Sequence, residues 1–330
     1  MSILCDGGQE LGFGHITRCI SIAQAFLKHG YKSEFIVNGD NSIASILAHE
    51  SYSLSHWQED KELLKKLEKS SLILIDSMQI SNSKLSEIEA SNIPVIYLDD
   101  EKRHNILNKG FVVDWTVLSD KKWDLLQKKK EITYLLGSSY TPLREEFTKA
   151  QKTRINKEIQ SILVTFGGAD VRNLTPKVLK QLTKKFPDIQ KNIIIGDGFD
   201  NKALIEEVQD DHTKLFNHVD ATKMIELMQK SDLAIASGGQ TLYELAYIGT
   251  PTIAILVVEN AKDDTEGWAS VGSLKNIGWY NEPHLLENLS TTIDSLQNEN
   301  VRVKMQESAK EYIRCDGAAH LVNSILKDLK

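Results

Sequence analysis

Short apolar runs that end in a glycine turn or a carboxylate recur along this chain, and segments with helical spacing separate them. In the first half the runs are residues 2–5, 33–37, 72–75 and 95–98. This alternation is typical of a parallel sheet wrapped by crossover helices. Because ligands bind at the carboxyl ends of the strands in such sheets, we expect functional residues at the ends of these runs.

The same pattern returns after a charged segment, residues 144–160. The later runs are residues 161–166, 192–196, 233–237 and 251–256. The chain has 330 residues, enough for two domains of ordinary size. We expect an α/β protein with two Rossmann-like domains, residues 1–150 and 151–330, facing a cleft. Residues from about 299 to 330 have helical spacing, and the sequence leaves open whether they cap the second domain or pack against the first.

Composition excludes several classes of protein. A net charge of −7 argues against wrapping nucleic acid or lying on an anionic membrane, because both need a concentrated basic surface. Cys5, Cys19 and Cys315 are too scattered for a disulfide framework or a structural zinc site. No signal-like start and no apolar stretch of about 18 residues is present. We expect a cytoplasmic protein without nucleic-acid partners or stable membrane insertion, and the sequence leaves the oligomeric state open.

The first glycine-rich turn, residues 6–14, follows a strand and opens a helix. Gly12 and Gly14 can leave backbone N–H groups facing a ligand at the positive end of that helix. A dinucleotide fingerprint would need glycine at position 17, where this chain has Thr17. His15, in the first helical turn, can take a proton from water as a neutral imidazole, or it can simply pack the start of the helix. Arg18 lies one turn further on and could bind a phosphate, orient a carboxylate or remain a surface residue.

Two similar turns occur in the second half. Residues 166–175 contain Gly167, Gly168 and Asn173 as candidate ligand contacts, although capping of the next helix would explain part of that pattern. The turn that starts at residue 237 is the best phosphate cradle in the chain. Its candidate contacts are Ser237, Gly238, Gly239, Gln240 and Thr241. Glu244, one turn into the following helix, could accept hydrogen bonds from ribose hydroxyls or could complement the helix dipole.

These motifs, taken in order, resemble the UDP-sugar hydrolase family of pseudaminic acid biosynthesis, and the resemblance covers most of the chain. The motifs are Gly12-Phe13-Gly14-His15 with Arg18-Cys19, Leu143-Arg144-Glu145-Glu146-Phe147, Phe166-Gly167-Gly168-Ala169-Asp170 with Asn173-Leu174-Thr175, Glu244-x4-Gly249-x-Pro251, and Asp316-Gly317-Ala318. That family hydrolyses UDP-2,4-diacetamido-2,4,6-trideoxy-β-L-altropyranose to UDP and the free sugar. It has the GT-B fold, which it shares with the glycosyltransferase that makes lipid II.

The resemblance implies a site and a mechanism. His15 would be the general base for water, the turn at residues 237–241 would hold the diphosphate of a UDP-sugar, and Glu244 would contact the uridine ribose. Single displacement at the anomeric carbon would invert its configuration. No cofactor and no metal would be required. The acids Asp76, Asp99 and Asp100 follow strands and could cap helices, bind a metal, or hydrogen-bond His15 or the sugar's acetamido groups.

Two segments depart from the family's pattern and bear on which sugar is bound. Residues 258–264 replace the family's usual Asn-Gln pair, and the first turn reads Asp6-Gly7-Gly8-Gln9-Glu10. Two other functions stay open at this point. One is a glycosyltransferase of the same fold, in which an acceptor hydroxyl replaces water. The other is a nucleotide-sugar sensor without catalysis.

Overall fold

The computed structural model describes residues 1–9, 11–78, 80–100, 107–123, 129–152 and 154–329. Glu10, in the first turn, lies outside these ranges. The chain forms two compact units. One comprises Met1–Arg144 together with Asp316–Lys330, and the other comprises Glu145–Cys315.

The first unit is built on a parallel sheet. Its strands are β1 (Ser2–Gly7), β2 (Glu34–Gly39), β3 (Ser51–Leu54), β4 (Ile73–Asp76), β5 (Val95–Leu98), β6 (Gly110–Asp114) and β7 (Ile132–Leu136), and its helices are α1 (Gly14–Leu27), α2 (Leu63–Leu67), α3 (Asn82–Glu89), α4 (Ser119–Trp123) and α12 (Gly317–Asp328). The strand order is β3-β2-β1-β4-β5-β6-β7, with every neighbouring pair parallel. The chain moves outward from β1 to β3 and then returns to β4, so the strand order reverses between β1 and β4.

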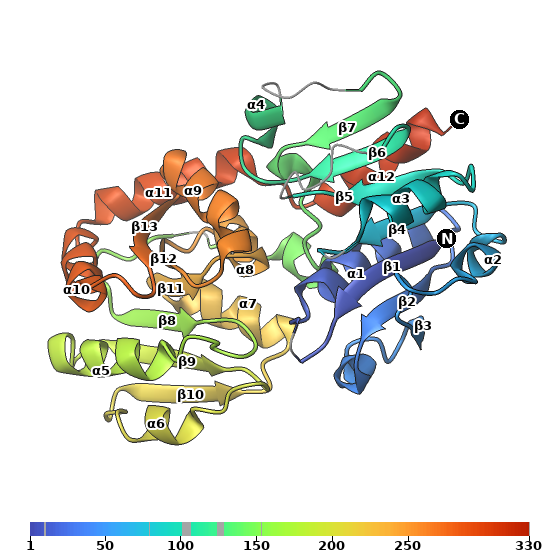
Figure 1. The fold of residues 1–330 in the computed structure, drawn as a ribbon. Coiled ribbons are helices and arrows are strands. Elements are labelled where there is room, and N and C mark those ends of the chain that lie inside the picture. Colours follow the sequence, from blue (N-terminus) through green and yellow to red (C-terminus); the bar gives the residue numbers. More distant parts are fainter. Residues whose placement is uncertain (10, 79, 101–106, 124–128, 153, 330) are drawn as a thin grey trace. The chain divides into compact units, whose positions relative to one another are not determined.

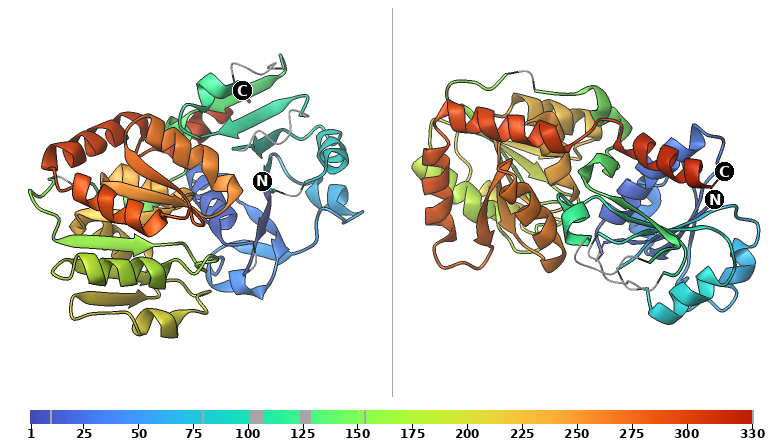
Figure 2. Two further views of the ribbon diagram at one scale, coloured as in Figure 1. Left: turned by 60° about the vertical axis from the view of Figure 1, so that its left-hand side comes forward. Right: turned by 90° about the horizontal axis from the view of Figure 1, so that it is seen from above.

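The second unit repeats this construction (Figures 1 and 2). Its strands are β8 (Ser161–Thr165), β9 (Gln190–Ile195), β10 (Thr213–Asn217), β11 (Leu233–Ser237), β12 (Thr252–Leu256) and β13 (Leu274–Trp279), and its helices are α5 (Thr175–Lys185), α6 (Lys202–Glu206), α7 (Ala221–Lys230), α8 (Gln240–Ile248), α9 (Lys262–Ser270), α10 (Leu285–Ser295) and α11 (Glu299–Tyr312). The parallel order β10-β9-β8-β11-β12-β13 reverses between β8 and β11. Among the described helices, none is long and apolar enough to cross a membrane.

The predicted fold class is confirmed, and the eight predicted strands correspond to β1, β2, β4, β5, β8, β9, β11 and β12. The sequence missed β3, β6, β7, β10 and β13. Four of these are edge strands, and two of the four, β3 and β10, contain no fully buried residue. An edge strand packs against one neighbour and needs no continuous apolar run, so its sequence signal is weak. The interior strand β6 does contain an apolar run, residues 111–113, that could have been recognised.

Alternate residues of the central strands pack into separate layers on the two faces of the first sheet. Leu4, Ile73 and Ile75 belong to a buried cluster with Leu63 of α2 and Leu85 of α3. Neighbouring residues along the same strands, which point the other way, are also fully buried. Burial on both faces explains why these strands read as continuous apolar runs. Each fully buried aliphatic side chain contributes roughly 1.5–3 kcal/mol to the driving force for folding.

The final residues of the chain belong to the first unit, whereas the sequence-based division assigned all of 151–330 to the second domain. Helix α12 packs against α1 (Figure 1) and buries Leu321, Val322 and Ile325. The His320 ring stacks on Tyr140 at 4.7 Å between centroids. The periodicity of a helix shows that it has an apolar face but does not show which surface will cover that face.

The lack of a side chain at Gly317 allows the start of α12 to pack closely against the first unit. A Cβ atom at this position would press into the Thr141 backbone, with the carbonyl carbon and the amide nitrogen each 3.0 Å away. We expect Gly317→Ala to destabilise the fold by about 1–3 kcal/mol, the usual cost of inserting an atom into a packed site. Thermal or urea unfolding monitored by circular dichroism would measure this. Asn323→Ala, on the exposed face of the same helix, is the control, and equal stability of the two variants would contradict the prediction.

Candidate functional site

The turn between β1 and α1 is closed by its own backbone. Gly8 N–H donates to the Gly12 carbonyl oxygen at 3.1 Å, and Gly12 N–H donates to the Gly8 carbonyl oxygen at 2.8 Å. Gly12 has a φ of 78°, a conformation that glycine adopts without strain. Helix α1 then begins at Gly14, which places His15 in the first helical turn. The turn therefore delivers His15 to the carboxyl edge of the sheet, beside the reversal of strand order.

His15 contacts a buried carboxylate that follows from the sheet register. Cys5 of β1 pairs with Asp76 of β4, so the carboxyl end of β4 lies beside the turn. His15 Nδ1 lies 2.7 Å from Asp76 Oδ1, and the Asp76 side chain is completely buried. Because an ionised carboxylate can only accept, it assigns the imidazole proton to Nδ1. The Nε2 atom then carries a lone pair that can accept a proton.

Arg18 is bound to the same carboxylate. Its Nε and Nη2 atoms donate to Asp76 Oδ2 and Oδ1, each at 2.6 Å, in a bidentate pair. Its Nη1 atom donates to Asp100 Oδ2 at 2.6 Å, and the guanidinium lies 4.9 Å from the ring centroid of Trp115. The sequence left open whether Arg18 binds a phosphate, orients a carboxylate or lies on the surface. In the structure it contacts two carboxylates.

Charge and burial act on Asp76 in opposite directions. Burial alone would raise the pKa of Asp76, but the charges and hydrogen bonds of Arg18 and His15 outweigh it and hold that pKa well below the usual carboxyl range. The buried Cys19 donates its thiol toward Asp76 Oδ2 at 3.6 Å, and burial raises the pKa of Cys19 well above its usual value. Asp76 is therefore ionised at neutral pH, and Cys19 is a poor nucleophile.

A second carboxylate lies close by, and the sequence did not single it out. Asp6, at the end of β1, is buried and accepts hydrogen bonds from Ser77 Oγ and, at 3.3 Å, from Asn38 Nδ2. Burial raises the pKa of Asp6, while these hydrogen bonds and the charge of His15 partly oppose that shift. Its position directly after an apolar run was the signal that could have identified it.

The turn between β8 and α5 is largely fixed by capping. Asp170, with a φ of 43°, accepts hydrogen bonds from the backbone N–H groups of Leu174 at 2.8 Å and Thr175 at 2.9 Å. Asn201 Nδ2 donates to Asp170 Oδ2 at 2.9 Å and to Asn173 Oδ1 at 2.7 Å. Capping thus accounts for Asp170, and the Asn173 side chain supports the turn.

The glycines of this turn lie at the reversal of strand order in the second sheet. Gly167 has a φ of 77°, and an added Cβ would meet no atom within 4 Å at Gly167 or at Gly168. This pair therefore borders open space, next to the end of β8.

The turn between β11 and α8 lies beside it in the sheet order. Ser237 ends β11 and Gly239, with a φ of 101°, precedes the first helical residue, Gln240. Among the described residues, no side chain caps the start of α8, and its first turn carries no acid. At Gly238 a Cβ would collide with the Cβ of Ala261 and would lie 2.7 Å from Thr265 Oγ1. The N-cap residue is thus a glycine without a side chain, and the positive end of the α8 dipole lies at this turn, which suits an anion.

The spacing Glu244-x4-Gly249-x-Pro251 has a structural explanation in part. Gly249 ends α8 in the left-handed conformation, with a φ of 84°, and Pro251 directly precedes β12. Glu244 lies within α8 with 5% of its surface exposed. The glycine and the proline end the helix and start the strand, while the role of Glu244 stays a prediction.

No group of three or more His, Cys, Asp or Glu side chains in the described part of the chain is arranged to hold a metal ion. Of the three acids that follow strands, Asp76 and Asp100 bind Arg18. Asp99 is fully buried.

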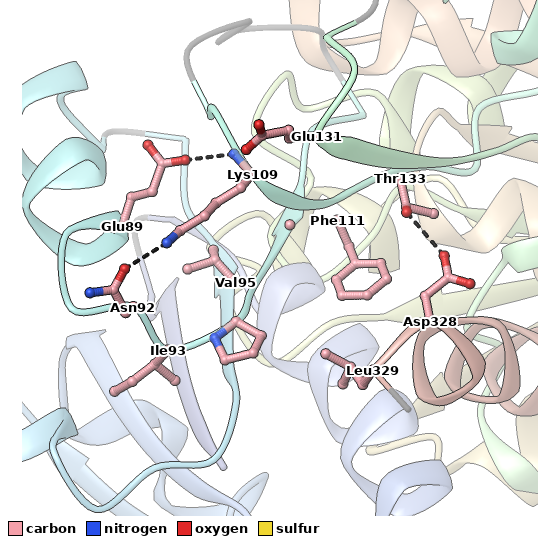
Figure 3. Close-up of a pocket in the computed structure, with 12 residues that line it drawn as sticks. Glu89, Asn92, Ile93, Val95, Lys109, Phe111, Glu131, Thr133, Asp328 and Leu329 are labelled. Atoms are coloured by element: carbon pink, nitrogen blue, oxygen red, sulfur yellow. Dashed lines mark hydrogen bonds between the residues drawn. The ribbon is translucent and has the colours of Figure 1, made fainter.

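Two of the pockets on the described part of the first unit lie at opposite ends of its strands. The larger, of about 670 Å³, lies where β1 and β2 end and is lined by residues that include Gly7, Asn38 and His56. The smaller, of about 280 Å³, lies where β5, β6 and β7 begin, and Phe111 points into it (Figure 3). The smaller pocket contains none of the site residues that the sequence predicted.

The buried pair of Asp76 and Arg18 makes stability depend on pH in a defined way. Because the fold lowers the pKa of Asp76, its ionisation stabilises the fold above the unfolded pKa of about 3.9, and this contribution is lost as the pH falls below that value. We expect the unfolding free energy of the wild type to fall more steeply between about pH 4 and pH 2 than that of Asp76→Asn.

Urea denaturation across this pH range would test the expectation, with Asp188→Asn as an exposed control. At neutral pH Asp76→Asn should cost about 3–5 kcal/mol, because it breaks a buried ion pair. Parallel curves for the wild type and Asp76→Asn would contradict the assignment.

Part of this chain matches a known domain family, and most of it is similar to several known proteins. Residues 161–322 match the glycosyltransferase family 28 C-terminal domain. The chain is 26% identical over 292 residues to the spore coat polysaccharide biosynthesis protein SpsG of Bacillus subtilis, a match that covers 84% of this chain and 83% of SpsG.

Two longer proteins are also similar. An uncharacterised protein of Methanocaldococcus jannaschii is 28% identical over 268 residues, which is 77% of this chain and 55% of that protein. The pseudaminic acid cytidylyltransferase and UDP-2,4-diacetamido-2,4,6-trideoxy-β-L-altropyranose hydrolase of Helicobacter pylori is 24% identical over 284 residues, 83% of this chain. The match spans 48% of the Helicobacter protein, so this chain corresponds to about half the length of each of these two relatives.

Solved structures with the same arrangement include MurG of Acinetobacter baumannii, with a TM-score of 0.68 and 13% identity over 99% of both chains. HepE of Anabaena, solved with UDP-glucose, has a TM-score of 0.62 and 12% identity over 99% of this chain and 100% of HepE. At this level of identity the likeness establishes the fold alone. Residues 161–322 are therefore similar to the glycosyltransferase family 28 C-terminal domain, and the chain has the GT-B fold.

Proposed function

We propose that this chain hydrolyses a UDP-linked diacetamido-trideoxy sugar at its anomeric carbon, releasing UDP and the free sugar for the biosynthesis of pseudaminic-type acids. The observation that carries the proposal is the 2.7 Å contact between His15 Nδ1 and the buried Asp76 carboxylate. It supplies a base at the carboxyl edge of a sheet, where open α/β proteins bind ligands. The similarity to a Helicobacter protein whose name includes this hydrolase supports the choice of substrate.

In the proposed reaction His15 Nε2 takes a proton from water as the water oxygen attacks the anomeric carbon. The bond from that carbon to the phosphate oxygen breaks, and UDP leaves with the electron pair. Because the attack and the departure occur on opposite sides, the configuration inverts, as in inverting glycoside hydrolysis. The chain thus needs one base and a site that stabilises charge on the departing diphosphate.

Asp76 and Arg18 would act through His15. As His15 becomes an imidazolium, the Asp76 carboxylate stabilises the new positive charge at 2.7 Å. Arg18 keeps Asp76 ionised despite its burial and fixes its orientation through two hydrogen bonds of 2.6 Å. We assign both as positioning residues, and His15 as the catalytic residue.

The second unit would supply the UDP site. The turn from Ser237 to Thr241 combines an uncapped helix start with a close-packed glycine, features that suit a diphosphate. In this proposal Glu244 accepts hydrogen bonds from the ribose, and Gly12, Gly14, Gly167, Gly168 and Asn173 belong to turns that border the substrate. The family 28 match over residues 161–322 supports a nucleotide-sugar site in this unit.

A glycosyltransferase is the alternative that a specific observation favours, because the matching domain family is one of glycosyltransferases. In that case an acceptor hydroxyl would replace water and His15 would deprotonate it. A sensor that binds UDP-sugars without turnover is the other alternative.

The test is UDP release from a panel of UDP-sugars, including UDP-2,4-diacetamido-2,4,6-trideoxy-β-L-altropyranose, without added acceptor. We expect His15→Ala to lower kcat by about 10²–10⁴-fold, the usual contribution of a general base, and to leave the Kd for UDP unchanged. Asp76→Asn should also lower kcat. His29→Ala, at an exposed histidine just after the end of α1, is the control.

Each alternative predicts a different result in the same assay. Release that requires an added acceptor alcohol would replace the hydrolase with a transferase. Binding of UDP-sugars without release under either condition would leave only the sensor. Full activity of His15→Ala would remove His15 from the chemistry.

A further inference from the structure

The larger pocket of the first unit lies at the carboxyl ends of β1 and β2, beside the turn that carries His15. We call it the amide pocket. Its lining residues are Gly7, Gly8, Gln9, Leu11, Asn38, Gly39, Asp40, Asn41, Ser42 and His56. Its volume of about 670 Å³ falls within the range of small-molecule sites, roughly 300–1,000 Å³.

The walls of the amide pocket are fixed to each other. Asp40 Oδ2 accepts a hydrogen bond from the backbone N–H of Gln9 at 2.9 Å, and Asp40 Oδ1 accepts one from that of Ser42 at 2.8 Å. A Cβ on Gly8 would collide with the Asp40 carboxylate, and one on Gly39 would collide with the Gly7 carbonyl oxygen. Hydrogen bonds to the Asp40 side chain and the close approach of Gly39 to Gly7 therefore hold the two turns together. Both oxygens of the Asp40 carboxylate already accept hydrogen bonds from the backbone.

A chain of hydrogen bonds selects the tautomer of the neutral His56 ring, which lines the pocket. Asp6 accepts from Asn38 Nδ2 at 3.3 Å, which turns the Asn38 oxygen toward His56 Nδ1, 3.0 Å away. His56 Nδ1 must then donate, so His56 Nε2 is an acceptor. The other Asp6 oxygen accepts from Ser77, the residue after Asp76. The same polar chain therefore runs from the pocket to the residue beside the carboxylate that holds His15.

The remaining groups define the chemistry of the ligand. Gln9 and Asn41 bring side-chain amides, which both donate and accept, and Leu11, 45% exposed, brings an apolar surface. The described lining residues include no lysine or arginine, and they include the carboxylate of Asp40, whose negative charge disfavours a phosphate. A neutral ligand that donates and accepts hydrogen bonds and has an apolar part matches these groups.

We propose that the amide pocket binds an acetamido group of the sugar, with His56 Nε2 accepting from its N–H and the amides of Gln9 and Asn41 donating to its carbonyl oxygen. The proposal rests on the proposed function, because it places the sugar of the UDP-sugar beside His15. It assigns recognition of the sugar to the first unit and makes His56 and Asn41 determinants of specificity.

The test measures binding without turnover, in a His15→Ala background. Isothermal titration with UDP, UDP-glucose and UDP-2,4-diacetamido-2,4,6-trideoxy-β-L-altropyranose gives three Kd values for each variant. Added His56→Ala or Asn41→Ala should weaken binding of the diacetamido sugar by about tenfold, the effect of one lost hydrogen bond, with UDP and UDP-glucose changed by less than about twofold. Both side chains are exposed, so both variants should fold, and His49→Ala is the matched exposed control.

The outcomes separate this inference from the proposed function. If both variants bind the diacetamido sugar as tightly as the background protein, the amide pocket does not recognise it, whether or not the wild type releases UDP. If binding weakens equally for all three ligands, the residues act on the fold and the inference is overturned. A selective loss supports the pocket even if the wild type proves to be a transferase.

Discussion

The fully buried carboxylate of Asp76 is the constraint on which the first unit's site depends. A buried charge is tolerated only when it is paired and hydrogen-bonded, and here Arg18 and His15 both meet that need from one face of α1. Arg18 in turn is held by Asp100 and by the face of Trp115. The result is an imidazole whose ring orientation and proton position follow from the packing of β1, β4 and α1.

Both units have a glycine-containing turn after a central strand, at the point where the strand order reverses. In each sheet a glycine turn follows a central strand and leads to a helix, so the positive end of the helix lies at the carboxyl edge. The units then differ in the side chain they add. The first adds His15 with its buried carboxylate, and the second adds no side chain at the start of α8, where Gly238 packs tightly on Ala261 and Thr265.

The turns of the two units therefore suit different chemical roles. An uncapped helix start is suited to an anionic leaving group, whereas an imidazole held by a carboxylate is suited to proton transfer. The polar chain from His56 through Asn38 and Asp6 to Ser77 adds a third element, which our proposal makes the recognition surface for an acetamido group. In our proposal, recognition, proton transfer and departure of the diphosphate belong to separate turns.

The sequence by itself determined the fold class, eight of the strands and the turns that carry the candidate site, because burial on both faces leaves continuous apolar runs and left-handed backbone favours glycine. It could not determine which strand ends become neighbours. The pairing of β1 with β4 brings Asp76 to His15 across 61 positions, and no local pattern encodes that distance. For the same reason the sequence did not identify Asp6 and His56, because only their hydrogen bonds in the folded chain distinguish them. It also left open which unit α12 packs against. An apolar stripe shows that one face of a helix is buried, but only tertiary packing decides which surface that face contacts.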